Sequence, residues 1–431
     1  MKGNFQLIII IVFVAAAIFG VLVFSGAIPI GDEEREGSLG TVVLWGTIKS
    51  SVMAPLLTDF NEANPAFTVK YVEKSEDSFD QDLLEAIASG VGPDIFFLPD
   101  NLALHYARRI FIIPYQSFPV ASFKNTFVGA GEVFLTSRGI LAFPIIVDPL
   151  MMYYNRSILD AKGIVYPPTF WDEMSSLVPA ITEKNDSNKI IKSAVALGHF
   201  SNVAHAKDIL ATLFMQTGNP IVAEKDGAFN SALGGSGSQQ NLASILKFYT
   251  DFANPTENVY SWNRSLPESA DAFSGEDLAF YFGFASELTA LVNRNPNQNF
   301  FIAPIPQIRG SNFKLTGARV TGLAISSFSK NFNTAFTAAS LMATGDFADK
   351  LRVVGGMVPA RRDLLANVPA DSYSPAFYNS ALFARSWLDP DSRGTDDIFR
   401  NMIDSVLSNS AGTGQAVSDA DSKLNLLLLQ P

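Results

Sequence analysis

In the first folded segment, stretches with the apolar pattern of a strand alternate with stretches that have the apolar spacing of a helix. Apolar runs of strand length occupy Thr41–Trp45 and Asp94–Leu98, and apolar positions alternate through Phe67–Tyr71. Between these runs, apolar residues recur at helical spacing over Met53–Phe60 and Phe79–Ile87, as on one face of a helix. Strands that alternate with helices predict a parallel sheet with right-handed connections.

Later segments predict that the chain leaves this first domain and returns to it. Gly139–Asn155 is typical of a strand, a proline and a second strand, so we place a first crossover near Phe143–Pro149. A further strand predicted over Val320–Ser326 places a second crossover near Thr316–Gly322, and a third is expected near Pro359–Leu365 or a little beyond. A chain that leaves one α/β domain, builds another and returns makes two lobes with a cleft between them.

Helical spacing covers most of the remaining chain. Thr169 is a suitable N-cap for a helix over Phe170–Val178, whose Trp171 we expect in the core. Further helices are predicted over these ranges: Ile209–Met215, Leu242–Tyr249, Phe332–Met342, Phe347–Val354, Ile398–Leu407 and Val417–Leu429.

The resulting division has four parts. We expect an N-terminal membrane anchor or signal peptide over 1–29, a tether over 30–40, lobe 1 over 41–145 and 318–362, and lobe 2 over 146–317 and 363–431.

The N-terminal apolar run bears on where the protein resides. Leu7–Phe24 is 18 residues without a charge, which as a helix would span about 27 Å, close to a bilayer core. Ser25-Gly26-Ala27 resembles a cleavage site, but the run is longer than an ordinary signal segment, so we favour an uncleaved anchor. In either case the bulk of the chain is expected to be exported.

Composition excludes several classes of function. Of 431 residues 48% are apolar, which provides ample core, and the net charge of −11 argues against nucleic-acid binding and for a soluble monomer. The chain has no Cys and only three His, so we expect no thiolate chemistry, no metal and no cofactor. No nucleophile elbow, phosphate-binding loop or zinc-protease motif appears, and neighbouring carboxylates such as Asp172 and Glu173 do not face one another on a helix. We therefore expect a binding protein and not an enzyme.

In their order and spacing, several short stretches resemble the extracellular solute-binding proteins of ABC importers, in the family 1 group that includes sugar- and maltose-binding proteins. They are Val42–Trp45, Phe60–Pro65, Gly92–Ile95, Tyr153–Asn155, Pro168–Glu173, Phe273–Phe280, Gly322–Ser326 and Gly356–Arg361. None is specific alone. One departure is plain, because the chain lacks the lipid-modified Cys that Gram-positive members typically carry.

The resemblance implies a periplasmic-binding-protein-like α/β fold, in which two lobes hold a solute at a hinge of two to three crossovers. It implies capture of a carbohydrate, expected to be an oligosaccharide, and delivery of that carbohydrate to ABC permease subunits in the membrane. Two alternatives stay open: a membrane-tethered receptor that senses its solute, and a receptor for a solute that is not a sugar.

A sugar site combines aromatic platforms with planar hydrogen-bonding side chains. Ligands of parallel sheets bind beyond the carboxyl ends of the strands, which points to the residues after the first and third predicted strands. Together with the positions suggested by the resemblance, the candidate ligand-binding residues are Trp45, Thr47, Asp100, Asn101, Asp148, Trp262, Phe284, Ser286, Arg319, Met357, Arg361 and Trp387. Each has a structural alternative, such as core packing for the tryptophans, a turn for the aspartates and an interlobe ion pair for the arginines.

Overall fold

The structure is a computed structural model that describes residues 39–235 and 239–429. Within these residues no helix is both long and apolar enough to cross a membrane. The N-terminal run Leu7–Phe24 and its tether lie outside the described residues.

Lobe 1 begins as the sequence predicts. Its sheet contains β1 (Thr41–Gly46), β2 (Thr68–Glu73) and β3 (Ile95–Pro99), with β1 parallel to both neighbours. Helices α2 (Ser50–Ala63) and α3 (Phe79–Ala88) connect these strands, and α2 buries the four residues expected on its inner face. The smaller elements that follow are η1 (Asp100–Leu102), α4 (Ala103–Tyr106), α5 (Val120–Thr126), η2 (Gly129–Phe134), β4 (Leu135–Thr136) and β5 (Gly139–Ile140).

Lobe 2 is the larger α/β half. Its elements in chain order are α6 (Arg156–Ala161), η3 (Trp171–Glu173), α7 (Met174–Ile181), β7 (Glu183–Lys184), β8 (Ile190–Val195), α8 (Ala206–Gln216), β9 (Val222–Lys225), β10 (Ala228–Ser231), α9 (Gln239–Asp251), α10 (Ser269–Ser274), β11 (Leu278–Phe284), η4 (Ala285–Glu287), α11 (Leu288–Arg294) and β12 (Phe300–Pro304).

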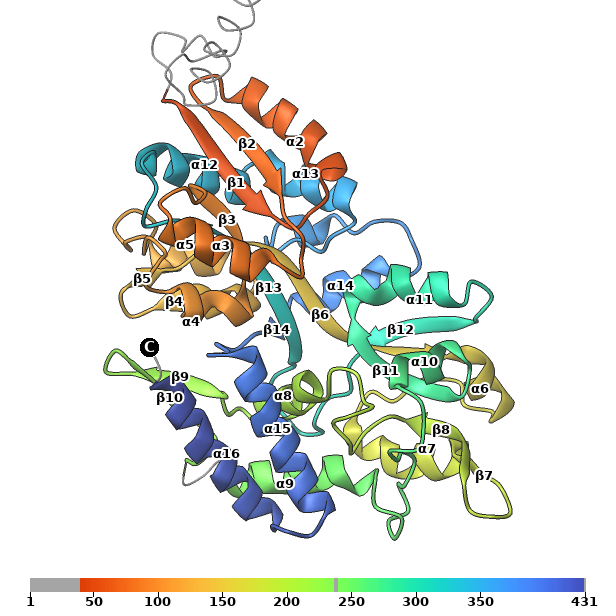
Figure 1. Cartoon of the computed structure of the whole chain (residues 1–431). Coiled ribbons are helices and arrows are strands. Elements are labelled where there is room, and N and C mark those ends of the chain that lie inside the picture. Colours follow the sequence, from red (N-terminus) through yellow and green to blue (C-terminus); the bar gives the residue numbers. More distant parts are fainter. Residues whose placement is uncertain (1–38, 236–238, 430–431) are drawn as a thin grey trace, which may run out of the picture.

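The rest of the chain returns to lobe 1 and leaves it again. These elements are α12 (Phe332–Thr344), α13 (Asp346–Gly355), η5 (Leu364–Ala366), α14 (Ser374–Ala381), β14 (Ala384–Arg385), α15 (Ser392–Leu407) and α16 (Thr413–Leu428). Figure 1 shows α12 and α13 beside the sheet of lobe 1, and α15 and α16 beside α9 in the opposite half.

Two long strands join the halves. β6 (Phe143–Asn155) and β13 (Thr316–Ile325) run antiparallel to each other at the centre of the sheet order β2-β1-β3-β13-β6-β11-β8-β7 (Figure 1). β13 pairs with β3 at one end, and β6 pairs with β11 and β12 at the other. The predicted lobe boundaries at 145/146 and 317/318 therefore fall inside continuous strands and not in linkers.

Two local predictions are wrong. Pro144 does not divide two strands, because it lies within β6 at a register shift opposite Gly322, where its missing N–H costs no ladder hydrogen bond. Thr169 does not cap a helix, since the backbone N–H of Thr169 donates to the Glu173 carboxylate at 2.8 Å and a 3₁₀ turn precedes α7.

Alternation in the central strands separates two core clusters. Val42, Leu44, Ile95 and Phe97 belong to a cluster covered by α2, α12 and α13. The intervening side chains of β3 join a larger cluster that continues along β6 into lobe 2 and includes Trp171, which is 4% exposed as expected for a core residue. This larger cluster includes side chains of β6 and β13, the two strands that join the halves. Packing from both halves therefore fixes the positions of these strands.

Candidate functional site

A cleft of about 1610 Å³ lies where the two halves face each other. Lobe 1 contributes the residues after β1 and β3, and lobe 2 contributes the first turn of α8, η4 and the first turn of α15. The middle of β6 and of β13 forms its floor. The position agrees with the rule that ligands bind beyond the carboxyl ends of parallel strands.

Eight of the twelve predicted site residues line this cleft. Thr47, Asn101 and Ser286 are exposed there, while Asp148, Met357 and Trp387 are half-buried. The complete set is Thr47, Asp100, Asn101, Asp148, Ser286, Arg319, Met357 and Trp387. The structure thus brings together residues that are far apart in sequence, from Thr47 to Trp387.

The two other predicted aromatic platforms, Trp45 and Trp262, lie outside the cleft lining, and the burial of Trp262 contradicts its predicted stacking role. Trp262 is 1% exposed and belongs to the large core cluster, so a sugar ring has no access to its face. Trp45 packs against the same cluster, and the Lys74 ammonium lies 4.0 Å from the centre of its ring. In this structure both side chains pack against the protein, and the stacking role of Trp45 stays a prediction.

Phe284 and Arg361 also have structural roles in place of the predicted contacts. Phe284 is 1% exposed and lies beneath the Arg319 guanidinium, whose carbon is 3.9 Å from the ring centre. Arg361 donates to the carbonyls of Thr344 and Gly345 at 2.6 and 2.7 Å, where it satisfies the last carbonyls of α12. Among the described residues its carboxylate partner is Asp363, only two residues away in sequence.

Asp100 is the carboxylate most closely tied to the hinge. It is 6% exposed, and its Oδ2 accepts from the backbone N–H of Val320 at 3.0 Å and from the Ser386 hydroxyl. Val320 lies on β13 and Ser386 follows β14, so this lobe 1 side chain contacts two of the connecting segments. Burial raises the pKa of Asp100 to about 7, although both hydrogen bonds and the charge of Arg319 oppose the shift.

Asp148 makes the equivalent connection from β6 to lobe 2. Its Oδ1 and Oδ2 accept from the backbone N–H and the hydroxyl of Ser286 at 2.9 and 2.6 Å. Burial raises the pKa of Asp148 above its ordinary value, and the two Ser286 hydrogen bonds counteract this only in part. Two residues that were predicted separately, Asp148 and Ser286, are thus in direct contact at the cleft floor.

Arg319 is held over the floor by neighbours that sequence reasoning missed. Its Nη2 lies 3.3 Å from Asp208 and 3.4 Å from Nδ1 of His205, and Nε2 of His205 lies 2.6 Å from the Glu287 carboxylate. Burial tends to raise the pKa of Glu287, but hydrogen bonds from His205 and Tyr281 outweigh it and lower the pKa. Arg319 remains about half exposed, at 53% of its side chain.

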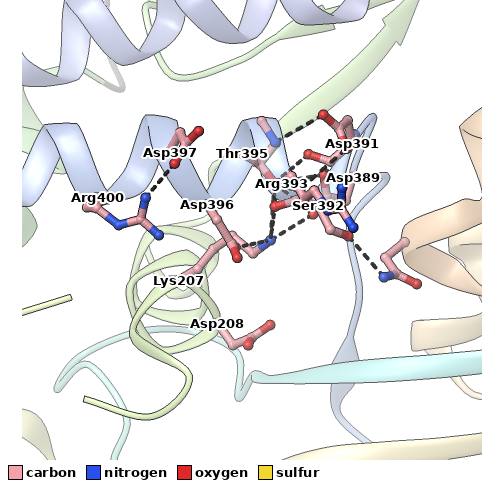
Figure 2. A network of polar contacts seen from close by, with 12 residues as sticks. Lys207, Asp208, Asp389, Asp391, Ser392, Arg393, Thr395, Asp396, Asp397 and Arg400 are labelled. Carbon is pink, nitrogen blue, oxygen red and sulfur yellow. Dashed lines mark hydrogen bonds and ion pairs between the residues drawn. The ribbon is translucent and has the colours of Figure 1, made fainter. Parts of the chain in front are cut away.

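A second polar cluster forms the wall between α8 and α15 (Figure 2). The Lys207 ammonium, 13% exposed, lies 3.0 Å from Asp389 and 2.7 Å from Asp396 and donates to Thr395 Oγ1 at 3.1 Å. Asp391 caps α15 by accepting from two N–H groups of its first turn. Asn101 of lobe 1 donates to the Ser392 hydroxyl at 2.9 Å, which connects lobe 1 to this cluster.

His205, Lys207 and Asp208 could have been located from the sequence only in part. The apolar spacing over Ile209–Met215 marks α8, and its first turn begins just before that run. Nothing local to those residues indicates that this turn faces lobe 1, because the orientation follows from packing of α8 against β13. The approach is close: a Cβ at Gly317 would lie 2.2 Å from Thr212 Oγ1.

Fold and cleft together define the class of two-lobed receptors that hold a solute between their halves. The model of the family described as bacterial extracellular solute-binding protein matches residues 45–344 of this chain. This is well over half of the chain, and the protein belongs to that family of extracellular binding proteins.

Individual relatives are distant. A Brucella abortus (strain 2308) protein whose name describes a binding protein is 22% identical over 391 residues, covering 86% of this chain and 88% of its own. A cyclo/maltodextrin-binding protein complexed with maltotetraose superposes with a TM-score of 0.73 at 16% identity, over 92% of this chain and 99% of that one. The sugar-binding protein MalE from Xanthomonas citri gives 0.69 at 19% identity, over 90% and 97%. At such identities the likeness establishes the two-lobed fold.

Proposed function

We propose that this protein is the exported subunit of an ABC importer, and that it captures a carbohydrate of oligosaccharide size by closing its lobes. The observation that carries the proposal is the cleft of about 1610 Å³, which exceeds the roughly 300–1,000 Å³ of ordinary small-molecule pockets. Ligand that contacts both halves shifts the equilibrium towards the closed form.

The chemistry of the cleft lining supports a sugar. Trp387 and Tyr373 offer aromatic faces, while Thr47, Asn101 and Arg319 offer neutral or charged hydrogen-bond donors around the same space. The names of proteins with the same fold add support, since one was solved with maltotetraose and others with cycloalternan or mannobiose.

Partners and location complete the proposal. Family members are expected to pass their solute to ABC permease subunits, and we propose the same here, with the receptor acting as a monomer. We also propose that Leu7–Phe24 tethers it to the membrane, on the basis of sequence alone, since these residues lie outside the described structure. No catalysis is proposed.

A thermal-shift screen of the full-length chain tests the central claim. We expect maltodextrins or manno-oligosaccharides to raise the melting temperature, because a ligand that binds only the folded state stabilises it. Shifts with amino acids, peptides or oxyanions, and none with any saccharide, would contradict the sugar assignment.

Replacement of Trp387 by Ala locates the site of whichever saccharide binds. Loss of an aromatic platform is expected to weaken binding by about 1–3 kcal/mol. Tyr166→Ala is the matched control, since Tyr166 is 80% exposed and lies outside the cleft lining. Equal affinities of the two variants would exclude Trp387 from the site.

A further inference from the structure

The cleft is strongly one-sided in charge. Its lining contains eight Asp and Glu residues against four Lys and Arg, namely Glu76, Asp80, Asp100, Asp148, Asp208, Asp371, Asp389 and Asp396 against Lys207, Arg319, Arg352 and Arg385. The whole chain has 42 acidic and 31 basic residues. The ratio of acidic to basic residues is therefore higher in the cleft lining than in the whole chain.

Three of the four cations are already engaged by the protein. Lys207 is bound between Asp389 and Asp396, and Arg352 is 11% exposed with Asp349 at 2.6 Å. Arg319 interacts with Asp208 at 3.3 Å. An incoming anion would have to compete with these carboxylates, so the cations offer it little.

Several carboxylates, by contrast, are held by neutral donors. Asp80 accepts from the Tyr106 hydroxyl at 2.8 Å, Asp148 from Ser286, and Asp371 from the Ser374 hydroxyl at 2.6 Å. Hydrogen bonds from hydroxyls hold a carboxylate in place but leave its negative charge uncompensated. A concave site lined by one sign of charge focuses the field and concentrates ligands of the opposite sign.

Protonation of the floor does not remove this bias. Burial raises the pKa of Asp100 to about 7, so this carboxyl carries only part of its charge near neutrality, and burial raises the pKa of Asp148 as well. Even with both neutral, six acidic residues of the lining face four basic ones. The sign of the field is thus set by the remaining carboxylates on both lobes.

We infer that the cleft selects saccharides by charge, so that it admits neutral and amino sugars and excludes acidic ones such as uronates. This inference rests on the proposed function, because it assigns the class of sugar to the same cleft. The exclusion is a repulsive element, because a uronate carboxylate would enter near uncompensated carboxylates. Of the four lining cations only Arg385, which donates to the Ala384 carbonyl, has no carboxylate partner among the described residues.

Calorimetric titration of the full-length chain with trimers of different charge tests the inference. The neutral probes are maltotriose, mannotriose and the trimer of N-acetylglucosamine. The cationic probe is the trimer of glucosamine, and the anionic probe is trigalacturonate. We expect at least one neutral or cationic trimer to bind, and trigalacturonate to bind at least tenfold more weakly than the tightest of them. Trigalacturonate as the tightest ligand would overturn the charge inference and leave the sugar receptor intact. Absence of binding by every saccharide would instead overturn the proposed function, and the inference with it.

A matched pair of variants identifies the source of selection. Glu76→Gln with Asp80→Asn removes two cleft charges on lobe 1, and should reduce the difference between trigalacturonate and the tightest neutral trimer at least threefold. Glu62→Gln with Asp186→Asn removes two exposed charges outside the cleft lining and should leave that difference unchanged. The same change in both pairs would show that net charge, and not the cleft, sets the preference, and would overturn the inference.

Discussion

Asp100 and Asp389 are two cleft carboxylates with nearly the same burial and different partners. They are 6% and 5% exposed, but Asp389 contacts the Lys207 ammonium whereas Asp100 accepts from a backbone N–H and a hydroxyl. Burial raises the pKa of both. Two equally buried carboxylates are therefore stabilised in different ways. The charge of Asp389 is balanced by the Lys207 ammonium, whereas Asp100, with a pKa of about 7, can become neutral by taking up a proton.

The largest effect is expected from Lys207→Met. It removes the cation between Asp389 and Asp396, and breaking a buried pair on one side typically costs about 3–5 kcal/mol. Urea unfolding of the variant and the parent measures the loss. Lys247→Met is the control, since Lys247 is 59% exposed in its pair with Asp251 and should cost about 1 kcal/mol or less. Equal losses would mean that the Lys207 cluster contributes nothing special to stability.

Asp100→Asn should change the pH dependence of stability by a few kcal/mol. The carboxyl has a pKa of about 7 when folded and about 3.9 when unfolded. Between these values the folded state binds more protons, so this group lowers the parent's stability as pH rises from about 4 to about 7. The variant lacks this decline, and its unfolding free energy relative to the parent should increase from pH 5 to pH 8. Parallel profiles would show that Asp100 does not titrate in this window.

Ser386→Ala sharpens the comparison by removing one neutral donor from Asp100. The cost should be about 1–3 kcal/mol at pH 8, where the carboxylate is charged and loses a partner, and smaller at pH 5. Ser244→Ala, on the exposed face of α9, controls for loss of a serine hydroxyl bonded to a helical carbonyl. A cost at Ser386 that does not vary with pH would separate the hydroxyl from Asp100 ionisation.

Asn101→Ala tests the contact between the surroundings of Asp100 and the cluster around Lys207 and Asp389. It has the smallest expected effect. Asn101 follows Asp100 and donates to Ser392 beside the Lys207 cluster. Loss of one exposed cross-lobe hydrogen bond should cost about 1 kcal/mol, which corresponds to about a fivefold weaker saccharide affinity if the bond forms on closure. Ser392→Ala should match it, and the double variant should lose no more than either single one. Additive losses would show that the two side chains act independently.

The sequence predicted the fold better than the site, because the spacing of apolar residues that marks a helix or a strand is a property of neighbouring residues. β1, α2 and β3 follow directly from apolar spacing, and so does the cleft position of Asp100 and Asn101 beyond β3. Pro144 was misjudged because its place in β6 depends on a register shift against Gly322 of β13, a segment distant in sequence.

The errors within the site share one physical cause, since burial of a loop depends on segments distant in sequence. Trp262 has no apolar periodicity around it, yet its backbone N–H donates to the Phe252 carbonyl at 3.1 Å and its ring is enclosed by the core. Lys207 was missed for the same reason, because its partners Asp389 and Asp396 come from the last quarter of the chain.

The return of the chain through β13 also governs when each half can become stable. The smaller core cluster combines Val42 near the start of the fold with Ile325 and Leu364, and the larger one requires Leu424 of α16. A polypeptide that emerges from its N-terminus onward cannot complete the smaller core before Leu364 has appeared, or the larger core before α16 has appeared, because contacts between distant segments must close first. Late completion of this kind leaves both cores open while most of the chain is being synthesised.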